Sequence, residues 1–166
     1  MKNVIIPGIL ICAVFIFVAI MLTSCVTLYR RFNFPEPSGQ FSVGSIAVEL
    51  VESGQYEVYT LDTDNERKIM FQIWYPVDSS NVEGLSSELY GYEIEKVLTM
   101  VSPKYGNKFS YLHEIPTNTY KNAPLSDSYE HYPVLLFSPG NRSTRFQNMV
   151  QVSEMLSQGY IVIGVD

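Results

Sequence analysis

The chain has 166 residues, of which 46% are hydrophobic and 17% are charged. This composition allows one ordinary hydrophobic core and excludes a chain that is disordered throughout. The formal net charge of −6 gives no general attraction to nucleic acid or anionic lipid, so we expect no nucleic-acid partner. Both cysteines, Cys12 and Cys25, lie near the N-terminus. The globular part therefore has no cysteine for a disulfide or a metal site.

The N-terminal stretch is apolar. Lys2 is followed by residues 4–22, which carry no charge and are long enough to span a bilayer. The tetrapeptide Leu22–Cys25 has the pattern of a bacterial lipoprotein signal, in which small residues precede a cysteine that receives lipid. An uncleaved signal-anchor is the alternative, favoured by Pro7 and the long apolar run. Both alternatives make residues 1–25 a signal or membrane anchor, and both predict an extracytoplasmic protein attached to a bacterial membrane.

Residues 26–42 form the predicted linker. Within it, Tyr29–Gln40 mixes arginine, proline and small residues, as a juxtamembrane segment does. Arg30 and Arg31 favour the cytoplasmic side by the positive-inside rule, but Lys2 and the amino terminus balance them. We therefore keep the extracytoplasmic prediction.

Two strands, residues 45–60 and 68–75, are predicted to form a hairpin. In the second, side chains alternate between two faces from Ile69 to Tyr75. The intervening residues 61–67 are polar and turn-forming. Their alternating acidic residues lack the glycine and the later glutamate of an EF-hand, so we interpret them as a solvated turn and not as a calcium site.

Residues 77–130 are the least regular part of the chain. An amphipathic set, which Pro103 is expected to end, consists of Ile94, Val97, Leu98 and Val101. Tyrosines are frequent between Tyr90 and Tyr132. Their amphipathic rings suit a lipid entrance, but composition alone favours packing against the sheet.

The two histidines, His113 and His131, are not expected to serve chemistry. Neither has partners at the spacing of metal ligands, so no metal site is predicted.

The last third of the chain has the pattern of a β-loop-α-β unit. Pro133–Phe137 is a short apolar run, typical of a strand buried on both faces, and Tyr160–Val165 is a second such run. Residues 138–141 break the first run. Parallel buried strands need a crossover, which the helical stretch between them supplies. Without later strands, we expect residues 160–165 to be unpaired or paired on one side only.

The predicted crossover helix covers residues 144–158. Thr144 and Gln147 have the spacing of a capping box, and Gly159 suits the position just past a helix end. The helical period predicts one buried face made of Phe146, Met149, Val150, Ser153 and Leu156.

Two fold families place chemistry in such a loop. In a nucleotide-binding βαβ domain, Arg142 or Arg145 would meet phosphate and Asp166 would hold the ribose. That fingerprint needs three glycines, and the loop has Gly140 alone, so this alternative is disfavoured. In an α/β-hydrolase, one backbone N–H of the loop helps to bind the oxyanion, which needs no glycine triplet.

Three segments then resemble one family of hydrolases. They are Arg67–Pro76 (RKIMFQIWYP), Tyr132–Asn141 (YPVLLFSPGN) and Leu156–Asp166 (LSQGYIVIGVD). Their order and spacing resemble the first part of the platelet-activating-factor acetylhydrolase group of α/β-hydrolases, over roughly residues 43–166. Many members have histidine before the loop glycine, where this chain has Pro139. That change preserves a backbone donor and removes any role of the histidine side chain.

The resemblance implies an incomplete α/β-hydrolase fold over residues 43–166, in which hairpin strands precede the β-loop-α-β unit and the apolar N-terminal helix precedes both. It implies a serine esterase that needs no cofactor and acts on a short-chain acyl ester or a phospholipid ester. The backbone N–H of Asn141, placed by Gly140, would be one oxyanion donor.

The catalytic triad is missing from the chain. No G-x-S-x-G motif occurs, and the nucleophile, acid and histidine follow the oxyanion loop in this fold. Ser138 and Ser143 are better explained by turn formation and capping. Since an α/β-hydrolase takes roughly 200 residues or more, we expect a fragment that is inactive alone. The alternative from another class is a non-enzymatic, membrane-tethered binding lipoprotein.

Overall fold

The computed structural model describes residues 11–21, 32–56, 65–141 and 143–165, and the chain divides into two compact units, residues 1–33 and 34–166. In the first unit, residues 11–21 are helical and exposed. Within the described ranges, no helix has the length and apolar character needed to cross a membrane. The Leu22–Cys25 motif lies outside the described residues.

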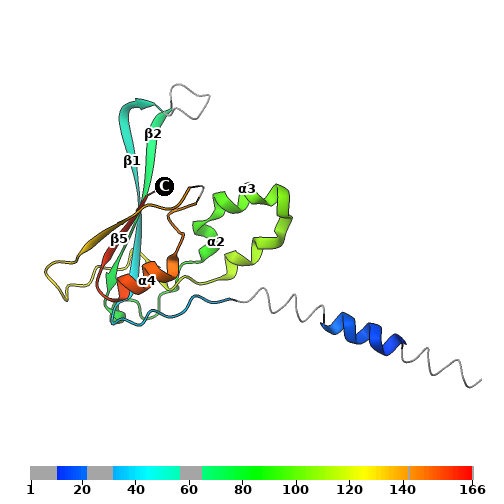
Figure 1. Ribbon diagram of the computed structural model, residues 1–166. Coiled ribbons are helices and arrows are strands. Elements are labelled where there is room, and N and C mark those ends of the chain that lie inside the picture. Colours follow the sequence, from blue (N-terminus) through cyan, green and yellow to red (C-terminus); the bar gives the residue numbers. More distant parts are fainter. Residues whose placement is uncertain (1–10, 22–31, 57–64, 142, 166) are drawn as a thin grey trace, which may run out of the picture. The chain divides into compact units, whose positions relative to one another are not determined.

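The second unit is built on a mixed sheet of five strands in the order β3-β1-β2-β5-β4 (Figure 1). β1 pairs antiparallel with β2, and β2 with β5, whereas the pairs β1–β3 and β4–β5 are parallel. The predicted hairpin and the predicted parallel pair are both present. The strands are β1 (Ser42–Tyr56), β2 (Glu66–Val77), β3 (Thr119–Lys121), β4 (Val134–Phe137) and β5 (Ile161–Val165).

One prediction about the sheet is wrong. We expected the run Tyr160–Val165 to lack a neighbour on at least one side, but β5 pairs with β2 on one side and with β4 on the other. The crossover returns the chain to the place beside β2, so order along the chain differs from order in the sheet. β4 is the edge strand on this side of the sheet, and β3 is the edge strand on the other.

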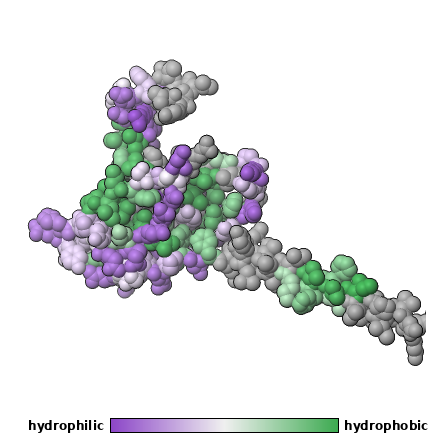
Figure 2. Space-filling view, in the orientation of Figure 1, coloured by the Kyte–Doolittle hydropathy of each residue, from purple (hydrophilic) through white to green (hydrophobic). Residues whose placement is uncertain are grey.

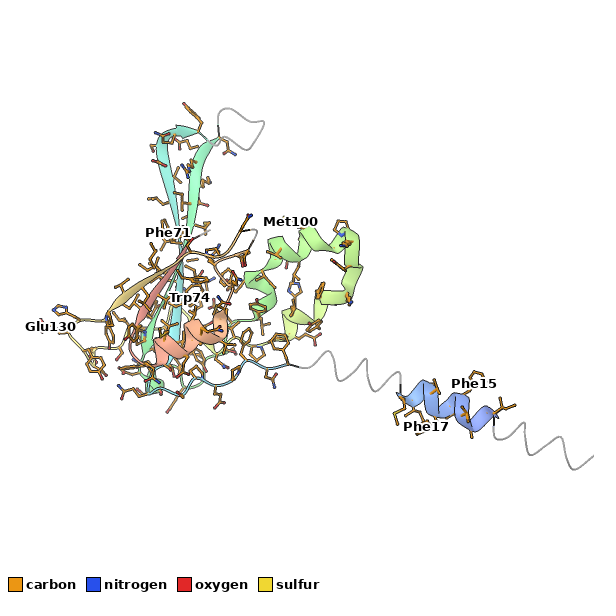
Figure 3. The ribbon with its side chains drawn as sticks, in the orientation of Figure 1. Phe15, Phe17, Phe71, Trp74, Met100 and Glu130 are labelled. Carbon is orange, nitrogen blue, oxygen red and sulfur yellow. The ribbon has the colours of Figure 1, made fainter. Side chains whose placement is uncertain are left out.

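Helix α4 (Met149–Ser157) covers one face of this sheet. Its Leu156 is fully buried in a cluster with Trp74 of β2 and Val162 of β5. The Trp74 ring meets the Phe146 ring edge-on at 5.8 Å between centroids, and Trp74 lies between the strands and α4 (Figure 3). A Cβ on Gly164 would come within 2.8 Å of the Trp74 ring, so the glycine makes this packing possible.

The helix differs from its prediction in two respects. It begins at Met149 and not near Thr144, because Asn148 has a left-handed backbone with φ of 63°. Val150 was predicted to be buried but is exposed on the outer side. The other four residues of the predicted face are buried, and Gly159 follows the helix with φ of 92°.

A helical excursion joins β2 to β3. Ile94 is buried in the same cluster as Trp74, with Val97 and Leu98 packed against it, as the amphipathic pattern predicted. Pro103 lies inside α3, which continues to Tyr105. The excursion consists of η1 (Ser79–Asn81), α2 (Tyr90–Glu93), α3 (Glu95–Tyr105) and η2 (Gly106–Glu114).

Several of the tyrosines pack on the fold. The ring of Tyr90 lies edge-on to Phe34 at 5.1 Å, and Tyr129 and Tyr132 pack against Phe41 at 5.8 and 6.1 Å. These contacts agree with the packing interpretation.

Candidate active site

The loop of residues 138–141 follows β4 directly. Because β4 and β5 are parallel and their last pair is Phe137 with Gly164, the loop lies at the carboxyl end of both strands. Open α/β sheets bind ligands at this edge. The topology therefore places the predicted oxyanion loop where a ligand would be expected.

Hydrogen bonds tie the loop to the turn before α4. The Gly140 N–H donates to Gln147 Oε1 at 3.2 Å, and the Ser143 N–H donates to the Gly140 carbonyl at 3.0 Å. The Thr144 hydroxyl accepts from the Phe146 N–H at 3.3 Å. Gln147 thus reaches the loop and does not complete the predicted capping box with Thr144. The side chain that was expected to cap the helix instead braces the loop.

The backbone N–H of Asn141 is uncommitted. Among the residues that the structure describes, it has no hydrogen-bond partner, and Asn141 is exposed. A donor for an oxyanion needs such an N–H, since a group already bonded within the protein would have to break that bond. Gln147 holds Gly140 through a hydrogen bond, and the N–H of the next residue, Asn141, is left for a ligand.

The reason for a glycine at position 140 is not steric within this loop. Gly140 is absent from the described residues with positive φ, and a Cβ there would lie 3.7 Å from Gln147 Oε1, an ordinary contact. The expected placing of the Asn141 N–H by Gly140 therefore does not depend on a positive φ at Gly140.

The two histidines, which were not predicted to be catalytic, lie away from the loop or pair with a glutamate. His131 precedes β4, at the opposite end of that strand from the loop, and pairs with Glu130 at 3.8 Å. His113 of η2 pairs with Glu95 of α3 at 3.3 Å. Within the described part of the chain, no group of His, Cys, Asp and Glu could hold a metal ion.

The described residue of the nucleotide alternative faces inward. The guanidinium carbon of Arg145 lies 4.6 Å from the centroid of the Phe146 ring, and its Nε is buried. This position suits packing against the sheet better than contact with a phosphate in the loop. Arg142 and Asp166 lie outside the described residues.

One cluster of charged side chains was not predicted from the sequence. Burial, then the neighbouring Glu88 carboxylate, raises the pKa of Glu93 to about 7, and Arg145 opposes this shift. Glu88 accepts hydrogen bonds from Ser45 and from Thr119, the latter at 3.1 Å. Ser45, Thr119 and Arg145 are far from Glu88 and Glu93 in sequence, so no local pattern could have brought them together.

Comparisons with known proteins agree with this geometry. A family model described as platelet-activating factor acetylhydrolase, isoform II, matches residues 26–166. Among solved structures, the chain resembles the ferulic acid esterase from Streptomyces cinnamoneus, with a TM-score of 0.63 and 20% identity. That match covers 81% of this chain and 36% of the esterase, so this chain spans about a third of that protein. Among curated proteins, none matches. The structural likeness identifies the fold as that of an α/β-hydrolase.

Proposed function

The chain belongs to the family of platelet-activating factor acetylhydrolase, isoform II, and from this premise we propose that it is the part of a serine esterase that carries one oxyanion donor. The observation that supports this role most directly is the uncommitted Asn141 N–H at the carboxyl end of β4. A backbone N–H of the corresponding loop binds the oxyanion in α/β-hydrolases.

The proposed chemistry is acyl transfer through a serine. A serine oxygen attacks the ester carbonyl, a histidine takes the serine proton, and negative charge develops on the carbonyl oxygen. The Asn141 N–H donates to that oxygen. Such a donor is typically worth about 3–4 kcal/mol in the transition state. The nucleophile, acid and base are proposed to lie beyond Asp166, and the 166-residue chain alone is then inactive.

The proposed substrate is a carboxylic ester with a short acyl chain, including a phospholipid ester. The description of the matching family as an acetylhydrolase supports a short acyl group, and the name of the structural neighbour supports ester hydrolysis.

Variants of Asn141 test the donor in the complete enzyme. Proline at 141 removes the N–H, whereas alanine keeps it and serves as the matched control. We expect Asn141→Pro to lower kcat on a short-chain aryl ester by about 10²–10³-fold, with KM less affected, and Asn141→Ala to keep most activity. Full activity in a correctly folded Asn141→Pro enzyme would contradict the assignment.

A binding lipoprotein is the second candidate. The exposed apolar surface of the sheet suits a ligand or a partner and requires no triad. Reading the gene beyond Asp166 separates the two candidates. A G-x-S-x-G motif after Asp166 supports the esterase, and a stop codon there would leave the binding role.

Attachment to a bacterial membrane is proposed for the N-terminus, with residues 1–25 as signal or anchor, 26–42 as linker and 43–166 as part of the hydrolase domain. The Leu22–Cys25 pattern supports lipidation. Metabolic labelling with a fatty-acid analogue should tag the protein, and Cys25→Ala should abolish the tag. An untagged protein that still sediments with membranes would favour the signal-anchor.

A further inference from the structure

Residues 34–41, called the strap below, precede β1 and lie along α4 (Figure 1). The N–H and the hydroxyl of Ser38 both donate to the Glu154 carboxylate, the N–H at 2.9 Å. The Gln158 amide donates to the same carboxylate at 3.1 Å and to the Ser38 hydroxyl at 3.3 Å. A closed ring of hydrogen bonds therefore joins the strap to the end of α4.

The backbone of the strap also completes the last turn of α4. The Gly39 N–H donates to the Ser157 hydroxyl at 3.0 Å, and the Phe41 N–H donates to the Ser157 carbonyl at 3.2 Å. The last carbonyls of a helix have no partner within the helix, so the strap supplies one. A Cβ on Gly39 would lie 2.0 Å from the Ser157 carbonyl oxygen. The strap can approach α4 this closely only because position 39 is glycine.

The strap belongs to the folded unit and not to the segment before it. The second compact unit begins at Phe34, and the family model matches from residue 26 onward. The ring of Phe34 lies edge-on to that of Tyr90 of α2 at 5.1 Å between centroids. The predicted linker, residues 26–42, thus ends in a segment with defined contacts.

The contacts of the strap differ in their exposure to water. Phe41 is 6% exposed and packs edge-on against two tyrosine rings at 5.8 and 6.1 Å. The ring of hydrogen bonds around Glu154 is exposed, as is the bond that the Asn118 amide donates to the Pro35 carbonyl at 3.1 Å. The strap therefore has one end held by burial, and the rest of it is held by polar contacts at the surface.

We propose that the strap opens and closes on α4, with Glu154 as its latch and Phe41 as its hinge. Hydrogen bonds at the surface have a small net value, because water replaces either partner, so the strap can open while the sheet stays folded. The consequence for attachment rests on the proposed membrane attachment of the N-terminus. A closed strap fixes the place where the preceding residues leave the domain, and opening frees residues 34–40, a length of at most about 25 Å.

The latch depends on the charge of Glu154. The hydrogen bonds from Ser38, followed by the one from Gln158, lower the pKa of Glu154 below its ordinary value. The side chain is therefore a charged acceptor at neutral pH, and charged acceptors form stronger hydrogen bonds than neutral ones. Glutamine at position 154 keeps the size of the side chain and removes its charge, so it should weaken the latch.

Amide hydrogen exchange of the whole chain tests the proposal. Three amides of the strap, those of Ser38, Gly39 and Phe41, donate hydrogen bonds to α4. We expect Ser38 and Gly39 to exchange more slowly than their intrinsic rates and faster than residues 161–165 of β5, with Phe41 slower than both because it is the hinge. Exchange of Ser38 at its intrinsic rate would show that no latch exists. Exchange at the rate of β5 would show that the strap opens only with the whole fold, and either result would overturn the proposal.

Two glutamate variants test the latch itself. Glu154→Gln should speed the exchange of Ser38 and Gly39 by about three- to tenfold and leave residues 161–165 unchanged. Glu36→Gln is the matched control, because it removes the same charge from the strap, and in the described part of the chain the Glu36 side chain has no hydrogen bond. Equal exchange in Glu154→Gln and in the native chain, or an equal acceleration by Glu36→Gln, would overturn the role of Glu154.

A steric variant opens the strap by a different route. Gly39→Ala keeps the Glu154 carboxylate and places a methyl group against the Ser157 carbonyl. We expect Ser38 to exchange close to its intrinsic rate in this variant, while residues 161–165 stay protected and report that the fold is intact. A Ser38 amide that keeps its native protection would contradict the close approach of the strap to α4.

The exchange measurement requires neither ester turnover nor a membrane, so the hypotheses fail separately. A latched strap in a protein that carries no fatty-acid tag and does not sediment with membranes would refute the attachment alone. A strap that exchanges at intrinsic rates in a protein tagged at Cys25 would refute the latch alone.

Discussion

Both faces of the sheet carry apolar side chains, but the two faces differ in how far these side chains are covered. One line of register partners joins Ser45, Trp74 and Val162 across β1, β2 and β5, and these residues are 0%, 1% and 3% exposed beneath α4. The next line joins Ile46, Ile73, Ile163 and Leu136 on the opposite face. There Ile46 is 39% and Leu136 is 73% exposed. In the described part of the chain, this opposite face, called the open face below, is covered near Val77 but exposed at Ile46 and Leu136.

The difference in burial between the two faces bears on how the apolar pattern of the strands is interpreted. Strands that are apolar on both faces are typical of a sheet covered on both sides. Figure 2 shows hydrophobic residues continuing up the stem of the β1–β2 hairpin, with hydrophilic residues near its tip. The esterase with the same fold is much longer, since this chain covers 36% of it. The strands of this chain are thus apolar on both faces, although the described residues cover the two faces unequally.

Truncating one aromatic side chain on each face of β2 should have the largest effect on stability. Comparing the two variants measures the difference in burial between the faces directly. Trp74 and Phe71 both lie on β2 and point to opposite faces (Figure 3). Trp74→Ala should cost about 3–5 kcal/mol of unfolding free energy, because it leaves a cavity under α4. Phe71→Ala should cost roughly half as much, since Phe71 is only partly buried. Urea unfolding of the two variants provides the comparison, and equal costs would show that the faces are equivalent.

A charge on the open face should change association more than stability. Leu136 lies on the edge strand, and exposed apolar edges pair with other chains. We expect the native chain to self-associate and Leu136→Lys to reduce this association, with stability altered by about 0.5 kcal/mol or less. Sedimentation velocity at several concentrations measures it.

Val150→Lys is the matched control for this charge, because Val150 is exposed on α4 and not on the open face. It should leave association unchanged. The apolar N-terminal segment is common to all variants, so it does not affect the comparison. A native chain that is a monodisperse monomer with a cooperative melt would contradict the importance of the open face.

Local patterns in the sequence predict much of this architecture. The alternation from Ile69 to Tyr75 gave the hairpin strand, and two apolar runs with a helical stretch between them gave the parallel pair. The insertion of β5 between β2 and β4 could not be predicted this way, because pairing partners depend on the whole sheet. The left-handed backbone of Asn148 was not predicted either, although asparagine favours both that conformation and helix N-caps, so the start of α4 was misplaced.

The candidate site was predictable only in its position along the chain. The family resemblance identified Asn141 and Gly140. It did not predict that Gln147 would accept a hydrogen bond from Gly140 instead of capping the helix. The contact between Glu93 and Glu88, and the effect of Arg145 on the pKa of Glu93, arise from tertiary packing. Such contacts leave no periodicity for sequence analysis to detect.

The smallest effect is expected in the loop itself, which belongs to neither face. Gly140 lacks a positive φ and has room for a methyl group, so Gly140→Ala should be neutral or stabilise the chain by about 0.5 kcal/mol through the unfolded state. Thermal unfolding checks this expectation, and a clear loss of stability would mean that the loop needs a backbone that alanine cannot adopt.

Gly140→Ala then shows whether Gly140 has a role in ligand binding that is separate from folding. If Gly140→Ala leaves the melting temperature unchanged but lowers ester turnover in the complete enzyme, the missing side chain serves the approach of substrate to the Asn141 N–H, since folding does not require it. Unchanged turnover would show that the loop needs only its backbone donor, and that glycine at this position is dispensable to both fold and chemistry.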